Sequence, residues 1–313
     1  ALQMPLLRAL HDELCQMPLE PLPDQFETGT NLKRSSVVEL DDYMHVIRVD
    51  SAVPAAVWLR SMVEAQLGWL HLVGKGGGES ADLKHVAAGF QAMHQVTART
   101  LETDLASVAA HPALVQPLAA TFEGHELLEI WRKGHWIFFV LTQALTIVFK
   151  RLVRALRDES TASARIELAT AIELFWASGA SMKLTGAFSN EQYHSEVRPT
   201  MTLGDDKAVV KTTSLSGAMT WDHHYLVNRV WREGLMPLLG TLPLGVQELY
   251  PEFLRAYREG LSTGHRAVCA KFGGESMGSL VAPNHIAVNL LDSIEATRLA
   301  QLSLQRNSKP SPG

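Results

Sequence analysis

Cysteine is scarce in this chain, because Cys15 and Cys269 are the only two among 313 residues. Two thiols are too few for the set of disulfide bridges that holds a small secreted fold together. The sequence also opens without the positively charged, apolar and small-residue pattern of a secretory signal. We therefore expect a cytoplasmic protein with reduced thiols.

Long apolar runs and an excess of one charge are missing as well. The longest apolar stretch, Trp136–Phe149, contains Thr142, Gln143 and Thr146, so it predicts a buried core helix and not a membrane span. The net charge is −5, with Lys and Arg interspersed among Asp and Glu. This pattern predicts no nucleic-acid partner and no membrane partner, and it allows a homo-oligomer.

Hydrophobic residues make up 46% of the chain, which is enough for a large helical core. The expected fold is all-α: a single helical domain over 1–306, hardest to assign in 1–50, and a disordered tail over 307–313. Helical patterns run from Ser51 to the glycines at Gly74–Gly78, then over Ser80–Ala110, Ala113–Arg132, Trp136–Arg157, Ser163–Leu184, Met219–Gly234, Gln247–Phe272 and Ala282 to about Arg306. Residues 186–218 are expected to be irregular, and Val37-Val38 and Val46-Ile47 are candidates for short strands.

The segment Gln247–Phe272 carries a histidine on an apolar stripe. Apolar and aromatic residues recur at helical spacing there, at Tyr250, Leu254, Tyr257, Leu261, Val268 and Phe272, with His265 in the same row. A buried imidazole needs a partner, which is a metal, a backbone carbonyl or a water. Cys269 lies one helical turn later. If His265 binds a heme, the Cys269 thiol is within reach of a heme vinyl group. The alternative is that Cys269 is a small residue of the core.

A second histidine group is Trp221-Asp222-His223-His224-Tyr225. Adjacent helical residues point about 100° apart, so at most one of the two histidines faces a given site. Either one is a candidate for a second metal ligand or a distal acid–base group. The alternative is a solvated or capping Asp-His pair near a helix start.

Three motifs resemble those of indoleamine 2,3-dioxygenase, in the same order. Phe253-Leu254 followed after ten residues by His265-Arg266 resembles the helix that supplies the proximal heme histidine. Tyr193–Pro199 is similar to the family's F-F-x-x-x-R-P stretch, and Trp136–Thr142 is similar to its distal G-F-F-x-x-S helix. Ser214-Leu-Ser-Gly217 stands near the position of its Gly-Ser-rich loop, and the whole match covers roughly residues 134–272.

The resemblance implies a role for each matching residue. His265 would bind the heme iron, and Arg198 would meet the carboxylate of the substrate. Tyr193 would line the distal pocket, and the neighbouring His194 would point either into the pocket or away from it. The other residues implied at the heme are Phe138 and Thr142 on the distal side, and Ser214 and Ser216 in the loop.

Cys269 and His224 depart from the dioxygenases and resemble the bacterial heme-dependent tyrosine hydroxylases of the same superfamily. Those enzymes carry a histidine, a spacer of about forty residues and then H-x-x-x-C, and here forty residues separate His224 from His265. The resemblance implies His265 and His224 as iron ligands and a heme joined covalently to Cys269. His85, on an early helix, would be the distal acid–base residue.

The implied activity is hydroxylation of L-tyrosine, or of a ring-substituted tyrosine, ortho to the phenol. The product would be a catechol such as L-DOPA, the oxidant would be hydrogen peroxide or dioxygen with a reductant, and the setting would be antibiotic biosynthesis. One alternative is a heme dioxygenase that opens an indole ring, which would need no thioether. The other is a helical binding protein without a cofactor, which would be colourless when purified.

Overall fold

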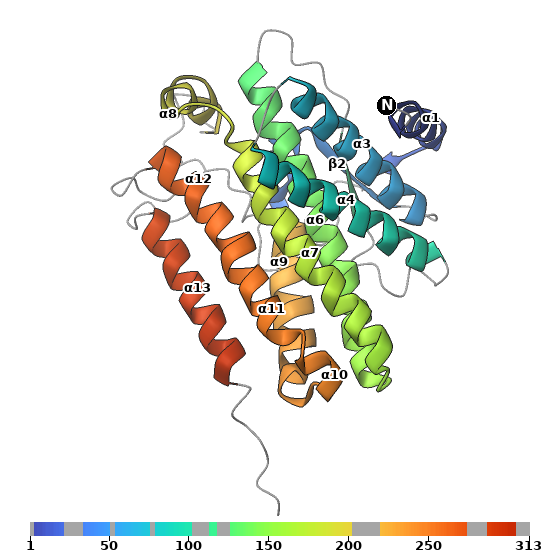
Figure 1. Ribbon diagram of the computed structural model, residues 1–313. Coiled ribbons are helices and arrows are strands. Elements are labelled where there is room, and N and C mark those ends of the chain that lie inside the picture. The colour runs from blue at the N-terminus through green and yellow to red at the C-terminus, as the bar shows by residue number, and fades with distance from the viewer. Residues whose placement is uncertain are drawn as a thin grey trace, which may run out of the picture.

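The computed structural model describes residues 3–21, 34–50, 54–75, 79–101, 113–117, 126–201, 220–273 and 287–304. Ser51, Ser214, Ser216 and the tail 307–313 lie outside these residues. Figure 1 shows a mainly helical protein built around two long helices, α6 (Glu126–Arg157) and α7 (Thr161–Thr185), which pack side by side. The predicted all-α class is therefore confirmed, with a small sheet added to it.

Helix α6 is the core helix of the protein. It merges the two segments that the sequence divided near residue 134, and Trp136–Phe149 is buried throughout. Its length and composition would allow it to cross a membrane, but 89% of its most apolar window is buried inside the protein. Tertiary packing thus explains its hydrophobicity, as the sequence predicted.

The N-terminal part lies against one side of this pair. Helix α3 (Pro54–Gly74) packs on α6, α4 (Ser80–Leu101) packs on α7, and α1 (Gln3–Cys15) packs on α3. Helix α2 (Arg34–Met44) leads into a three-stranded antiparallel sheet with the order β1 (Glu20–Pro21), β2 (Val46–Asp50), β3 (Ala113–Pro117). In its register, Val49 pairs with Pro21 on one side and Leu114 on the other.

The sheet corrects two expectations. Val46-Ile47 lies in a strand as predicted, but Val37-Val38 belongs to α2. Residues 113–117 form β3, although the sequence indicated a helix from Ala113. A short apolar run has no period of its own that separates strand from helix, and here pairing with β2 decides.

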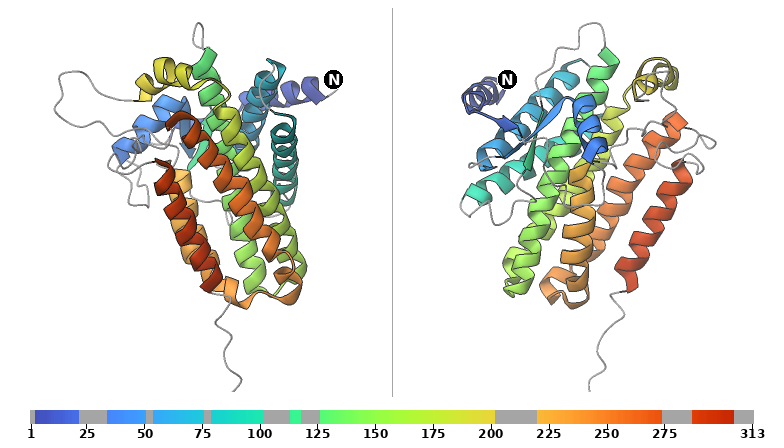
Figure 2. Two further views of the ribbon diagram at one scale, coloured as in Figure 1. Left: turned by 60° about the vertical axis from the view of Figure 1, so that its left-hand side comes forward. Right: turned by 180° about the vertical axis from the view of Figure 1, so that it is seen from behind.

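Elements of the C-terminal half pack against α6 and α7. Short turns of α8 (Asn190–Gln192), the π-helix η1 (Tyr193–Val197) and the 3₁₀-helix η2 (Arg198–Met201) lie in the segment that was expected to be irregular. Helix α13 (Ala287–Leu304) lies alongside α12 (Thr263–Gly273), as both views of Figure 2 show. Between these segments the chain forms α9 (Trp221–Tyr225), η4 (Leu226–Leu235), η5 (Met236–Thr241), α10 (Leu244–Gln247), α11 (Tyr250–Arg255) and η6 (Ala256–Ser262).

The π-helical segment η6 changes the face that carries His265. A π turn holds one more residue than an α turn, so the residues after it are rotated relative to a regular helix. The buried face runs through Tyr250, Phe253, Tyr257, Gly260, Gly264 and Phe272. Leu254, Leu261, His265 and Val268, which were expected on that face, lie at its half-buried edge.

Three glycines bring α12 and η6 into backbone contact with α7. A Cβ atom on Gly264 would lie 2.5 Å from the carbonyl oxygen of Gly179, and one on Gly179 would overlap the carbonyl oxygen of Gly260. Larger residues at these positions would force the helices apart. This contact therefore sets the position of His265, the residue that follows Gly264, relative to the core.

Candidate functional site

His265 projects from α12 as a neutral, half-buried imidazole. Burial, followed by the nearby charge of Arg298, lowers its pKa to about 4. Its ring nitrogens have no hydrogen-bond partner within the described part of the chain. A nitrogen lone pair is thus available, which is what a metal ligand requires.

The Cys269 thiol lies one turn further along the same helix and is also half-buried. Burial raises its pKa to about 11, so the thiol is protonated at neutral pH. Residues four apart on a helix have Cβ atoms about 5–6 Å apart on one face. His265 and Cys269 can therefore hold one flat group at two points.

An aromatic wall stands next to this pair. The Tyr193 ring of η1 stacks on the Phe272 ring with a 4.3 Å centroid separation, and Phe188 stacks on Phe272 at 5.2 Å. The Trp131 ring of α6 lies 5.9 Å from Tyr193. Tyr193 is close enough to Cys269 that a charge on that sulfur would raise the pKa of its phenol. The structure thus brings the Tyr193 segment to the helix that carries His265 and Cys269.

Arg198 and His194 flank Tyr193 in different ways. Burial raises the pKa of Tyr193, whereas the adjacent Arg198 lowers it through its charge and a hydrogen bond. The His194 Nε2 donates a hydrogen bond to the Phe272 carbonyl oxygen at 3.0 Å. His194 therefore anchors this segment to the end of α12, while Arg198 is the cation at the aromatic wall.

His135 of α6 belongs to the same group and was missed by the sequence analysis. Its Nδ1 donates a hydrogen bond to the Trp131 carbonyl oxygen at 2.7 Å, which leaves Nε2 as an acceptor in the neutral ring. Burial lowers its pKa to about 4, and a charge on the nearby His265 would lower it further. Its ring lies 4.5 Å from Trp131 and 6.3 Å from Phe139. The signal was a histidine one turn before the Phe138-Phe139 pair on an apolar helix.

His85 lies elsewhere. Its ring stacks on Trp176 at 5.3 Å, where α4 meets α7, and no hydrogen bond, ring contact or charge interaction within the described residues joins it to His265, Cys269 or Tyr193. The sequence alone could not show this, because the position of an early helix relative to α12 depends on tertiary packing. Among the described histidines, His135 has an electrostatic link to His265.

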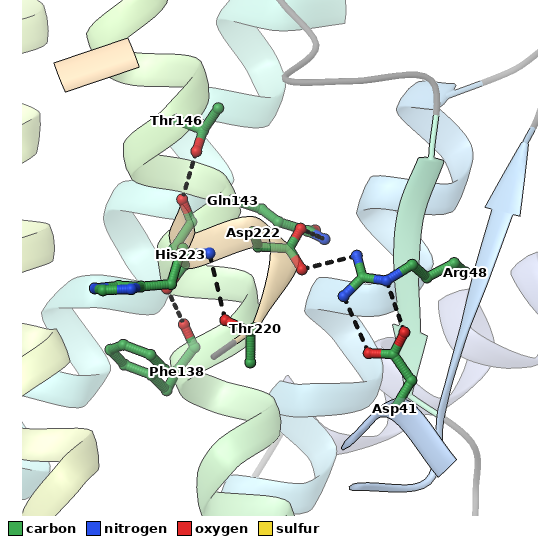
Figure 3. A network of polar contacts seen from close by, with 9 residues as sticks. Asp41, Arg48, Phe138, Gln143, Thr146, Thr220, Asp222 and His223 are labelled. Carbon is green, nitrogen blue, oxygen red and sulfur yellow. Dashed lines mark hydrogen bonds and ion pairs between the residues drawn. The ribbon is translucent and has the colours of Figure 1, made fainter. Parts of the chain in front are cut away.

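Phe138 and Thr142 lie further along α6. Both are buried, and the Thr142 hydroxyl donates to the Phe138 carbonyl oxygen at 2.8 Å. Figure 3 shows the Phe138 ring on the same side of α6 as the His223 ring. The Phe138 ring therefore lies on the side of α6 toward which His223 projects.

His223 and His224 follow a capped helix start. The Thr220 hydroxyl accepts a hydrogen bond from the His223 amide at 3.3 Å, and burial lowers the pKa of His224. The two rings are 6.5 Å apart and steeply inclined, as expected for neighbours on a helix. No contact among the described residues joins His224 to His265, so its role as a second ligand stays a prediction.

These residues fit a heme. No group of three or more His, Cys, Asp or Glu side chains that could hold a bare metal ion occurs in the described ranges. A heme iron needs fewer protein ligands, because the porphyrin supplies four nitrogens and a single histidine can complete the site. One neutral histidine, a thiol one turn away and an aromatic wall define the class: a helical protein with a site that fits a heme.

The comparisons with known proteins identify the family within this class. The model of the family described as SfmD 3-methyl-L-tyrosine peroxygenase matches residues 6–247, so the chain belongs to that family. The crystal structure of reduced SfmD, obtained by soaking with sodium hydrosulfite, resembles this structure with a TM-score of 0.52. It is 20% identical, and the alignment covers 82% of each chain. No match was found among curated proteins.

The family confirms the resemblance to the bacterial heme-dependent tyrosine hydroxylases of the heme aromatic oxygenase superfamily. It supports a heme-dependent oxidoreductase of the peroxygenase type. The matched residues end at 247, before His265 and Cys269. The roles of individual residues therefore rest on the geometry described above.

Proposed function

We propose that this protein hydroxylates L-tyrosine or a ring-substituted tyrosine, such as 3-methyl-L-tyrosine, ortho to the phenol. The observation that carries the proposal is the gathering of Arg198, Tyr193 and His135 around the helix of His265 and Cys269. With hydrogen peroxide as oxidant, one oxygen atom enters the ring and the other leaves as water. With dioxygen, two electrons and two protons from a reductant complete the balance. The family's printed activity, that of a 3-methyl-L-tyrosine peroxygenase, supports a substrate of this kind. The proposed setting is antibiotic biosynthesis in the cytoplasm.

The amino acid would be held at two ends. Arg198 would bind the substrate carboxylate with its planar fork of donors, which suits a carboxylate better than a lysine does. Tyr193 and the rings stacked beside it would pack against the substrate ring and exclude water. A phenol bound in this way presents its hydroxyl to a protein acceptor at the far end.

We propose His135 for that acceptor in place of His85. The Trp131 carbonyl fixes its tautomer, so Nε2 can accept the phenol proton and raise the electron density at the ortho carbon. His85 is packed against Trp176 and is not part of this group. A neutral His135 at pH 7 is in the protonation state that this task requires.

The heme, when bound, would supply the oxidising power taken from peroxide. His265 would bind the iron, and His224 is the proposed second, displaceable ligand. Phe138 and Thr142 would line the distal side, with Ser214 and Ser216 in the loop over the heme. The Cys269 thiol would add across a vinyl double bond, forming one S–C bond and moving its hydrogen to the other vinyl carbon, with no net oxidation.

Product analysis tests the proposal. Purified heme-loaded protein is incubated with peroxide and L-tyrosine, 3-methyl-L-tyrosine or L-tryptophan, and the products are identified by mass spectrometry. We expect a gain of one oxygen, as a catechol, on one or both tyrosines. A ring-opened tryptophan product with no catechol would replace the proposal with the indole dioxygenase, and a colourless protein would reject both enzymes.

A further inference from the structure

A buried charged network ties α9 to the N-terminal part of the protein. The Arg48 side chain of β2 is 4% exposed and donates two hydrogen bonds to Asp41 of α2, from Nε at 2.7 Å and from NH2 at 3.0 Å. Its NH1 donates to Asp222 of α9 at 2.9 Å. The other Asp222 oxygen accepts from Gln143 of α6 at 3.3 Å. One network of polar contacts therefore links four elements, α2, β2, α6 and α9 (Figure 3).

Two consecutive residues of α9 contact this guanidinium. Asp222 binds its edge, and the Cζ atom of Arg48 lies 4.9 Å from the centre of the Trp221 ring. Side chains of consecutive helical residues point about 100° apart, so holding both fixes the rotation of the helix about its axis. The planar fork of Arg48 has one orientation that satisfies Asp41 and Asp222 together.

The next two residues are the histidine pair. With Trp221 and Asp222 held on Arg48, the helical rotation turns His223 away from it. Figure 3 shows the His223 ring pointing away from Arg48, on the side of α6 where the Phe138 ring lies. The rotation of this helical turn is thus held by a strand more than 170 residues earlier in the chain, since Arg48 and Asp222 are separated by 174 positions.

We propose that Arg48 is a positioning residue that fixes the rotation of α9 and so the directions in which His223 and His224 project, with His223 on the Phe138 side of α6. The proposal rests on the proposed function in one respect, the binding of iron by one of the pair. A purely structural ion pair would stabilise the fold without controlling these two rings. Buried ion pairs often add little net stability compared with apolar residues. Stability alone therefore does not explain this network, whereas a role in orienting α9 does.

Two substitutions separate orientation from charge. Arg48→Lys keeps the positive charge but loses the fork, so one ammonium group cannot hold Asp41 and Asp222 in the same geometry. Asp222→Ala removes the contact from the side of α9, whereas Asp222→Asn keeps an oxygen that accepts from Arg48. Arg99→Lys is the matched control, because Arg99 pairs with the buried Glu167 between α4 and α7, away from α9.

Two measurements on heme-loaded protein decide the outcome. The first is the modification of His223 and His224 by diethyl pyrocarbonate, followed by mass spectrometry of the peptide. The second is the spin state of the resting heme by absorption and electron paramagnetic resonance. We expect Arg48→Lys and Asp222→Ala to speed modification several-fold and to increase the high-spin fraction. Asp222→Asn and Arg99→Lys should stay near the wild type in both measurements.

The proposal is overturned if Arg48→Lys lowers the melting temperature as Arg99→Lys does and leaves the modification rates unchanged. If Arg48→Lys does not fold, the same comparison between Asp222→Ala and Asp222→Asn decides. A wild-type heme that is already fully high-spin would reject the second iron ligand in the proposed function. The modification rates would still decide the role of Arg48.

Discussion

At the scale of single residues, the site depends on groups kept in one protonation state by burial. His265 and His135 are neutral because burial lowers their pKa values to about 4, and the Cys269 thiol is protonated because burial raises its pKa to about 11. Each group is therefore in the protonation state that its proposed role requires. His265 has a lone pair for iron, His135 can accept a proton from a phenol, and Cys269 carries the hydrogen that a vinyl carbon would receive.

Cys269→Ala should abolish covalent attachment and leave iron binding by His265 in place. A helix holds the thiol and the imidazole on one face, and such fixed proximity strongly favours their reaction with one bound group. The wild-type protein should keep one added heme mass after acid-acetone extraction and denaturing mass spectrometry. Cys15→Ala, at the exposed cysteine, is the control and should keep that mass. Complete extraction of heme from the wild type would contradict the thioether.

Arg198→Ala should weaken the binding of tyrosine but not of heme. Loss of a paired charged contact costs about 2–5 kcal/mol, which is at least about a thirtyfold loss of affinity. Titration of heme-loaded protein with L-tyrosine, followed by the change in the Soret band, measures this. Tyrosine methyl ester is the matched ligand: it should bind wild type and variant alike. Equal binding of the ester and of tyrosine to the wild type would show that Arg198 does not meet the carboxylate.

At the scale of elements, small residues set the position of α12, the helix that carries His265. Gly264 and Gly179 allow the backbones of α12 and α7 to touch, and η6 rotates the helix so that His265 sits beside that contact. The buried Arg48 network performs a comparable task for α9, with polar groups in place of small ones. Each proposed ligand helix is thus positioned by a contact next to its histidine.

Gly264→Ala should destabilise the protein and disturb the heme. The added methyl would lie 2.5–2.8 Å from the backbone of Gly179, and overpacking of this kind costs about 1–3 kcal/mol. A lower melting temperature and a shifted Soret band are expected together, because the displaced residue precedes His265.

Gly68→Ala is the control for this substitution. Its added methyl would meet only the flexible Lys133 side chain, at 3.6 Å or more. In the middle of α3, alanine should be neutral or stabilise by up to about 1 kcal/mol. A Gly264→Ala protein with the stability and spectrum of the wild type would show that this contact does not position His265.

At the scale of the whole molecule, folding stability should depend on pH through buried histidines. The folded-state pKa of His135 is about 4, below the ordinary value of 6.5, so the unfolded chain binds this proton more readily. The contribution of His135 is therefore fully present above pH 6.5 and is lost as the pH falls toward 4. Between pH 6.5 and pH 5 the loss is about 2 kcal/mol. Asp41 acts in the opposite direction, since its folded-state pKa is raised from 3.8 to about 6.

His135→Asn isolates this effect, because asparagine can keep the donor to the Trp131 carbonyl while removing the titrating ring. In heme-free protein, the urea midpoint should fall less between pH 7 and pH 5 in the variant than in the wild type. Parallel pH profiles for His135→Asn and the wild type would contradict a buried, neutral His135.

The sequence by itself determined the helical class, the family and the residues of the H-x-x-x-C helix. These properties depend on local sequence. A few turns of chain are enough to show the helical period, the spacing of His265 and Cys269, and motifs such as Arg198-Pro199. Trp136–Phe149 was predicted as a core helix because the apolar run is short and three polar residues interrupt it.

Only the tertiary structure decided which distant residues meet. It placed His135 close enough to His265 for an electrostatic interaction, and it placed His85 where α4 packs on α7. Helix packing, and not sequence order, decides which residues are neighbours in both cases. It turned residues 113–117 into a strand, since pairing with β2 outweighs the weak preference of a short apolar run. It also rotated the predicted stripe through η6 and placed Arg48 against Asp222, because a π turn and a contact across 174 positions have no signature in local spacing.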